Sequence, residues 1–81
     1  MSVILYTRAG CHLCHAVQDW LLEAGVAWQS ADITADPLLY ERYKYRIPVV
    51  EREGREVLAA PITRADVQRV FLGDGWNRSM V

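Results

Sequence analysis

The succession of apolar patterns predicts an α/β fold, in which a mixed four-stranded sheet is flanked by helices in the order β-α-β-α-β-β-α. Runs rich in β-branched and aromatic residues, typical of strands, alternate with runs in which apolar residues recur every three or four positions, typical of helices. The first two strand-like runs are joined by a helix and should be parallel, whereas the last two are joined by a short turn and should form an antiparallel hairpin. A chain of 81 residues corresponds to one domain, residues 1–81.

The first half of the chain supplies the parallel part of the sheet. We predict strands over residues 2–7 and 26–33, and between them a helix over 12–24 that stops at Gly25. The apolar stripe of this helix consists of Leu13, Val17, Trp20, Leu21 and Ala24.

A short second helix should begin at Asp36 and Pro37, because aspartate is a good N-cap and proline fits the first helical turn. We expect Leu38, Leu39 and Tyr43 to face inward from it. With helices on both faces, the sheet can bury apolar residues on both sides.

The second half of the chain supplies the hairpin and the last helix. Residues 46–50 predict a third strand opened by Pro48, which suits the start of a strand. A turn containing Gly54 leads to a short strand around residues 57–58. The remaining elements are a helix capped by Thr63 and Asp66, with an apolar face of Val67, Val70 and Phe71, and a loose tail over residues 73–81.

Composition argues against several classes of function. The net charge is -1 with basic and acidic residues interspersed, so no basic patch is available for nucleic acid or for an acidic membrane surface. The longest apolar run is too short to span a membrane, and the N-terminus lacks the order of a signal peptide. We therefore expect a cytoplasmic monomer with no nucleic-acid or membrane partner, in a compartment where two cysteines are catalytic or metal-binding rather than a structural link.

Cys11 and Cys14 form a C-x-x-C motif at the junction of a predicted strand and helix. Free backbone N–H groups and the helix dipole favour negative charge at a helix N-terminus, and so lower the pKa of a thiol placed there. Cys11 is therefore the expected nucleophile, and Cys14, almost one turn later on the same side, is expected to resolve a mixed disulfide. Arg8 and His12 could add positive charge beside the thiolate.

Other uses of the motif stay open at this point. The cysteines could be small buried residues. With His12 and His15 they could bind a metal, although a closed zinc site usually needs a second ligand pair and the chain has no other cysteine or histidine. The letters C-H-L-C-H also match the haem attachment motif, but a strand precedes them, Met80 is a poor axial ligand and no export signal is visible. We expect no bound metal or cofactor.

The stretches Y-T-R-A-G-C-H-L-C and Y-R-I-P-V-V, with the hairpin at Gly54, resemble a divergent glutaredoxin-like branch of the thioredoxin superfamily from about residue 3 to residue 72. The resemblance implies the thioredoxin fold and a cis peptide bond before Pro48, which would lie against the cysteine pair. A cis bond there would put the backbone N–H and C=O of Ile47 at the edge of the site, ready to pair with an extended thiol substrate.

The resemblance also implies substrate-binding residues. Arg8 stands where glutaredoxins often bind a glutathione carboxylate, and Ile47 stands where the backbone pairs with the cysteinyl unit. We therefore expect Arg8, His12, Ile47 and Pro48 to contact the substrate. Residues 58–61, L-A-A-P, depart from the pattern, because glutaredoxins usually have a glycine pair and an acidic residue there that hold the γ-glutamyl carboxylate. Glutathione is thus a candidate co-substrate only.

The leading hypothesis is a thiol-disulfide oxidoreductase that reduces a small thiol disulfide or a protein disulfide through Cys11 and Cys14. The alternatives are an iron–sulfur or metal carrier, and a non-enzymatic binding module that uses the thioredoxin fold for its groove. Loss of the glycine pair argues against the cluster carrier, because glutathione supplies ligands in that mode.

Overall fold

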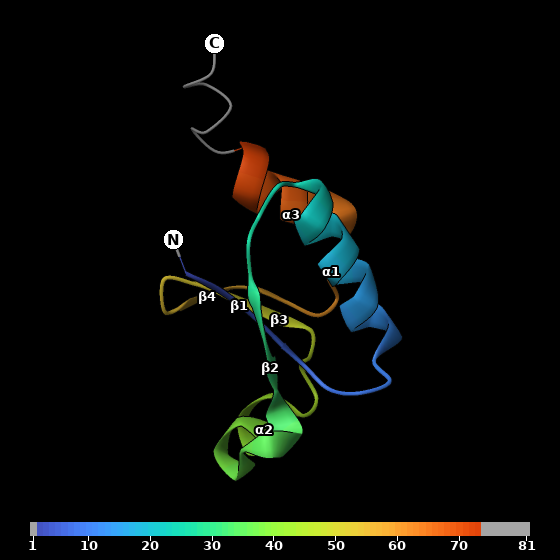
Figure 1. Cartoon of the computed structure of the whole chain (residues 1–81). Coiled ribbons are helices and arrows are strands. Elements are labelled where there is room, and N and C mark those ends of the chain that lie inside the picture. The colour runs from blue at the N-terminus through green and yellow to red at the C-terminus, as the bar shows by residue number, and fades with distance from the viewer. Residues whose placement is uncertain (1, 74–81) are drawn as a thin grey trace.

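The first strand, β1 (Val3–Thr7), divides its side chains between two faces of the sheet. Val3 and Leu5 are buried on one face and Tyr6 on the other. Successive side chains of a strand point to opposite faces, so a strand buried on both needs cover on both. The computed structural model, which describes residues 2–73, supplies that cover with helices on each side (Figure 1).

The elements follow the predicted order, and the sheet is mixed. β1 lies at the centre, parallel to β2 and antiparallel to β3, and β4 pairs with β3 at the edge, giving the order β2-β1-β3-β4. This confirms the predicted α/β fold class with the thioredoxin-type arrangement. The remaining bounds are α1 (His12–Glu23), β2 (Gln29–Asp32), a 3₁₀ turn (Ile33–Ala35), α2 (Pro37–Tyr43), β3 (Val49–Arg52), β4 (Arg55–Ala59), α3 (Arg64–Gln68) and a π-helical turn (Arg69–Gly73).

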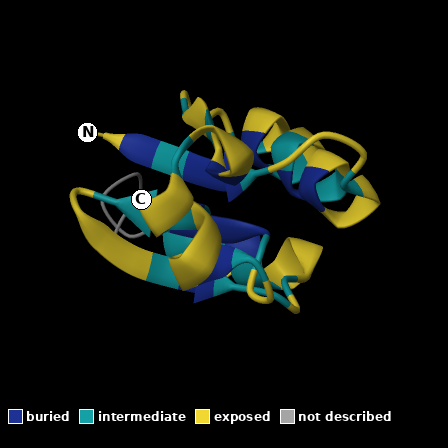
Figure 2. Cartoon of the chain, turned by 90° about the horizontal axis from the view of Figure 1, so that it is seen from below, coloured by how far each residue is buried: buried dark blue, intermediate teal, exposed yellow. Residues whose placement is uncertain are grey.

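The helices α1 and α3 cover one face of the sheet, where they pack side by side (Figure 1). Burial of a side chain such as Leu21, which is 0% exposed, stabilises the fold by about 1.5–3 kcal/mol, so this layer holds α1 in place. Figure 2 shows the buried segments concentrated in the strands and in the helix faces that meet them. The buried residues of this layer are Val3, Leu5, Val17, Leu21, Val50, Leu58, Val67 and Phe71.

The helix α2 covers the other face with a smaller cluster. The ring of Tyr43 stacks on that of Tyr6 with centroids 4.6 Å apart, beside the buried Ile33 and Val49. Burial, followed by the nearby Glu51 carboxylate, raises the pKa of Tyr6, so its hydroxyl stays protonated and donates to that carboxylate at 3.3 Å. The second cluster therefore links the central strand to the segment that precedes β3.

The hairpin between β3 and β4 turns on two residues in the left-handed backbone region. Glu53 has φ 53° and Gly54 has φ 78°. Positive φ at both central positions is the geometry of a type I′ turn, whose twist matches that of the flanking strands. The predicted hairpin at Gly54 is confirmed, with longer strands than residues 57–58 alone.

Two predicted strands have different bounds. The second covers Gln29–Asp32 rather than residues 26–33, because the Val26 N–H is used to close the end of α1 on the Leu21 carbonyl. The third begins at Val49 rather than residue 46, since the Arg46 N–H still bonds back to the Tyr43 carbonyl. In both cases a backbone N–H that the strand pattern assigned to the sheet is instead hydrogen-bonded to a carbonyl at the C-terminus of a helix.

Two leucines predicted to face inward are exposed. Leu13 is 66% exposed, since Cys14, at 0%, occupies the inward position one step further along α1. Leu38 is 81% exposed, whereas Leu39 is half-buried and Tyr43 buried, as their spacing of four along α2 allows. The side chains of adjacent helical residues point about 100° apart, so when one of them packs against the sheet the other is left exposed.

The last helix has the predicted cap but is short, and a π-helical turn continues it to Gly73. The predicted loose tail falls on residues 74–81, outside the described residues apart from Gly73 itself. Within residues 2–73 we find no helix long and apolar enough to cross a membrane.

Candidate active site

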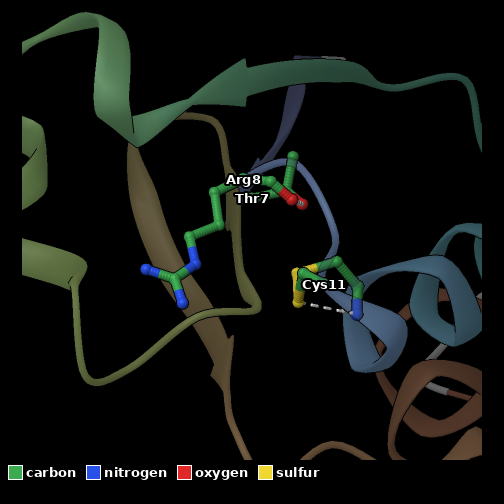
Figure 3. The surroundings of a disulfide bond; sticks show 4 residues. Thr7, Arg8 and Cys11 are labelled. Carbon is green, nitrogen blue, oxygen red and sulfur yellow. Dashed lines mark hydrogen bonds between the residues drawn. A yellow bond between two sulfur atoms is a disulfide. The ribbon is translucent and has the colours of Figure 1, made fainter.

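Cys11 and Cys14 form a disulfide at the junction of β1 and α1, with their Cα atoms 5.2 Å apart. Figure 3 shows this bond beside the loop that leaves β1. Cys14 is completely buried in the helix layer, whereas Cys11 is half-buried. Only the first sulfur is therefore placed where a substrate could approach it.

The backbone turns at Gly10 so that Cys11 becomes the N-cap of α1. Gly10 has φ +79°, a left-handed conformation that favours glycine. The Cys11 N–H bonds to the Arg8 carbonyl at 3.3 Å, and the Cys11 sulfur accepts the Cys14 N–H at 3.1 Å. The first helical turn contains no acidic residue. In the reduced form, the Cys14 N–H and the helix dipole would stabilise a thiolate on Cys11.

Pro48 lies at the same end of the sheet as the cysteine pair. The strand register pairs Tyr6 with Val49, which places Pro48 beside Thr7, the last residue before the cysteine loop. The bond Ile47–Pro48 is cis and Pro48 is fully buried, as the resemblance implies. Proline has no N–H, so it presents no backbone donor to the sulfurs.

The Ile47 N–H, which was expected to face the substrate together with the Ile47 carbonyl, has a partner within the protein. That N–H donates to the Tyr43 carbonyl at 3.1 Å, and the Arg46 N–H donates to the same carbonyl at 2.8 Å. The end of α2 thus leads directly into the cis-proline segment, and its last carbonyl, that of Tyr43, accepts the Ile47 N–H. No sequence signal marks this, because the pattern Y-R-I-P carries no information about where a helix will close.

A second cis peptide bond, Ala60–Pro61, was not predicted. It lies against the first proline, because the Ala60 N–H donates to the carbonyls of Pro48 at 3.0 Å and Arg46 at 3.3 Å. An Ala-Pro pair carries no local mark of its isomer, so only this packing identifies it. The stretch that replaces the glycine pair of glutaredoxins therefore offers neither the Ala60 N–H nor a Pro61 N–H to a ligand.

The N-terminus of α3 is closed by its own side chains. The Thr63 hydroxyl accepts the Asp66 N–H at 3.1 Å, and the Asp66 carboxylate accepts the Thr63 N–H at 2.9 Å. That backbone hydrogen bond, together with Arg69 and the Thr63 side chain, lowers the pKa of Asp66. The predicted cap is confirmed, and the backbone N–H groups of Thr63 and Asp66 are both hydrogen-bonded within it.

Among the hydrogen bonds of the described residues, none joins the side chain of Arg8 or His12 to a cysteine sulfur, which accepts only the Cys14 N–H. Figure 3 shows the Arg8 side chain extended away from the sulfur atoms, and its guanidinium has no ion pair within residues 2–73. His12 is exposed in the first turn of α1, with its ring edge-on to His15 at 6.5 Å. In the part of the chain that the structure describes, no cluster of three or more histidine, cysteine or acidic side chains is arranged to hold a metal ion.

Known proteins share both the sequence and this architecture. Residues 2–72 match the family described as the Glutaredoxin-like domain (DUF836). The Gene 56 protein of Mycobacterium phage L5 is 32% identical over 71 residues, which are 88% of this chain but 61% of that protein, so the chain spans about three-fifths of the length of this relative.

Two solved structures have the same fold. A structural genomics target protein, XcR50 of X. campestris, is 32% identical with a TM-score of 0.77, over 85% of this chain and 93% of its own. The glutaredoxin of Brucella melitensis is 25% identical with a TM-score of 0.65, over 99% of this chain and 87% of its own. The disulfide at a helix N-terminus, the cis proline beside it and the match over almost all described residues agree: the chain belongs to the Glutaredoxin-like domain (DUF836) family.

Proposed function

We propose that the protein is a thiol-disulfide oxidoreductase in which Cys11 is the nucleophile and Cys14 the resolving cysteine. The observation that carries this is the unequal burial of two bonded cysteines at one helix N-terminus. Cys11 is half-buried at the N-cap, and Cys14 is 0% exposed behind it. Such an arrangement lets an external sulfur reach the first cysteine but not the second.

The reaction begins from the reduced pair. The Cys11 thiolate attacks one sulfur of a substrate disulfide, so that a Cys11–substrate bond forms, the substrate S–S bond breaks, and the departing thiolate takes up a proton. Cys14, as thiolate, then attacks the Cys11 sulfur, and the second substrate thiol leaves. The substrate has gained two electrons and two protons, and the protein is left with the Cys11–Cys14 disulfide seen in the structure.

A thiol donor must then return the disulfide to the dithiol by the same exchange in reverse. Glutathione is a candidate donor, as the resemblance to glutaredoxins implies, and the reducing cytoplasm is the compartment in which the cycle would run. Pro48 would keep backbone donors away from the sulfurs during both steps, since it is buried at the same sheet edge and has no N–H.

The test uses reduction of insulin and of hydroxyethyl disulfide with a dithiol as electron source. Cys11→Ser should lose activity on both substrates, because serine cannot form the mixed disulfide. Cys14→Ser should accumulate a Cys11–substrate adduct that mass spectrometry detects, since the resolving step is blocked. Equal rates for the wild type and Cys11→Ser would exclude this function.

A further inference from the structure

Arg46, the second residue before Pro48, is held by hydrogen bonds of its backbone to two different parts of the fold. Its N–H donates to the Tyr43 carbonyl at the end of α2 at 2.8 Å, and its carbonyl accepts the Ala60 N–H, from the segment after β4, at 3.3 Å. The same Ala60 N–H donates to the Pro48 carbonyl at 3.0 Å. The backbone on both sides of Ile47 is thereby held between α2 and the end of β4.

The side chain of Arg46 makes a third connection, to the edge strand β4. Its guanidinium donates to the Glu56 carboxylate, with which it forms an ion pair, and lies 5.9 Å from the ring centroid of Tyr43. The Tyr43 ring is buried and stacks in turn on Tyr6 of β1. Because a guanidinium is attracted to an aromatic face, the ring and the Glu56 carboxylate both restrain the arginine.

The segment that Arg46 restrains lies at the strand end from which the cysteine loop departs. Pro48 is fully buried beside Thr7, the last residue of β1. The carbonyl of the next residue, Arg8, accepts the Cys11 N–H at 3.3 Å. Figure 3 shows Thr7, Arg8 and Cys11 around this turn. A shift of residues 46–48 would therefore move one side of the site.

The guanidinium of Arg46 is already occupied within the protein. It is bound by the Glu56 carboxylate and lies over the Tyr43 ring, so it is not free to bind a substrate. The two side chains of the ion pair are 45% and 34% exposed, and a pair so exposed adds little to the stability of the fold. An effect of this pair on the reaction would come mainly from where it holds the segment before Pro48.

We propose that Arg46 is a positioning residue for the reaction at Cys11, and that its ion pair with Glu56 holds the Ile47–Pro48 segment where an extended disulfide substrate meets it. This inference rests on the proposed oxidoreductase function. The Ile47 carbonyl accepts no hydrogen bond from residues 2–73, which leaves it for an N–H of a peptide substrate, as in strand addition. Hydroxyethyl disulfide has no peptide backbone and reacts at Cys11 without using the segment.

The experiment measures kcat/KM for a disulfide-linked peptide pair and for hydroxyethyl disulfide, and follows the ratio of the two values. Arg46→Gln and Glu56→Gln should each lower this ratio by about threefold to tenfold, because a displaced segment orients the peptide poorly and does not affect the small disulfide. The double variant should lose no more than either single variant, since both changes break the same ion pair. Arg46→Lys, which keeps a positive charge opposite Glu56, should recover most of the ratio.

Arg64→Gln is the matched control. Arg64 and Glu23 form another partly exposed arginine–glutamate pair, which joins α3 to the C-terminal end of α1, and breaking it should leave the ratio unchanged. The unfolding midpoint of every variant is measured in parallel. A merely structural role of Arg46 would lower kcat/KM for both substrates in proportion to the loss of folded protein, so the ratio would stay constant and the positioning role would be contradicted.

The two proposals fail in different ways. A wild-type chain that reduces neither the peptide pair nor hydroxyethyl disulfide contradicts the oxidoreductase function itself. A ratio that falls no further in Arg46→Gln than in Arg64→Gln contradicts the positioning role and leaves the function intact. A ratio that falls in Arg46→Gln but stays constant or rises in Glu56→Gln also contradicts it, because an arginine that contacts the substrate directly would be freed by the loss of its partner.

Discussion

At the N-terminus of α1 the Cys11 sulfur accepts the Cys14 N–H at 3.1 Å, and at the N-terminus of α3 the Thr63 hydroxyl accepts the Asp66 N–H at the same distance. Both caps have extended backbones, and both accept from the residue three positions later. In α3 the Asp66 carboxylate also accepts the Thr63 N–H, whereas in α1 Cys14 is joined to Cys11 by a disulfide. One local geometry therefore closes a helix end in one place and brings two sulfurs together in the other.

The two helix termini differ in the charge of their first turns. The first turn of α1 has no acidic residue, so its free N–H groups and dipole act on the cap sulfur. The first turn of α3 carries Asp66, whose charge and hydrogen bonds already satisfy the helix end. Breaking each cap should therefore affect a different property, activity in α1 and stability in α3.

The largest effect is expected for Cys11→Ser. Turnover should fall by about 10³-fold or more, because the nucleophile is lost. Stability measured against the reduced wild type should be unchanged or higher, since serine is a preferred N-cap. Disulfide reduction assays and denaturant unfolding under reducing conditions measure the two properties. A clear loss of stability would show that Cys11 does more for the fold than cap the helix.

Thr63→Ala should produce the opposite pattern. Removing this cap should lower the free energy of unfolding by about 1 kcal/mol and the melting temperature by about 4–8 °C. Activity per folded molecule should stay constant, because the cap does not touch the sulfurs. Thr63→Ser is the matched control and should keep both properties. A loss of activity larger than the loss of folded protein would mean that α3 helps to shape the site.

Acid should weaken the cap of α3. The lowered pKa of Asp66 means that the folded state favours its carboxylate form. That stability is present above the ordinary pKa of 3.8 and is lost as the pH falls through the lower value of the folded state. Asp66→Asn should flatten this part of the pH dependence in unfolding experiments, whereas Asp19→Asn, on the exposed side of α1, should not. Equal slopes for the wild type and Asp66→Asn would contradict the assignment.

The smallest effect is expected where the two helices meet at the surface. Arg64 donates to both oxygens of Glu23, at 2.7 and 3.0 Å, and lowers the pKa of that carboxyl. Both side chains are exposed, so the pair adds little to stability. Arg64→Gln should give a small decrease in the unfolding midpoint at low salt that disappears at high salt. A large decrease that persists in salt would instead indicate a packing role for the arginine stem.

Much of the fold follows from local patterns. The strand pattern of Val3 to Thr7, the helical repeat through Val17 and Leu21, and the caps at Asp36 and Thr63 all predict their elements, because each signal lies within a few residues of the structure that it describes. In the candidate site, the local pattern predicted that the C-x-x-C pair lies at the start of a helix, whereas the cis bond before Pro48 was implied by the resemblance to glutaredoxins; the structure has both features.

The helical repeat placed Leu13 on the inward stripe, but the side chain is 66% exposed. The helical repeat allows either Leu13 or Cys14 to face the sheet, and the packing of α1 buries Cys14. The same ambiguity applies to Leu38 and Leu39 on α2. Periodicity defines the position of an apolar stripe only to within one residue, and packing against the sheet decides which of two neighbouring side chains is buried.

By itself, therefore, the sequence determined the order of the elements, the position of the cysteine pair and that of the proline beside it, because these depend on spacing and on residue type. Only the tertiary structure decided which backbone donors remain free at the site. The N–H groups of Ile47 and Ala60 bond to carbonyls that packing brings to them, Tyr43 for the first and Arg46 and Pro48 for the second. Every non-proline residue has the same backbone N–H donor, so its hydrogen-bond partner depends on the tertiary structure around it and not on the residue type.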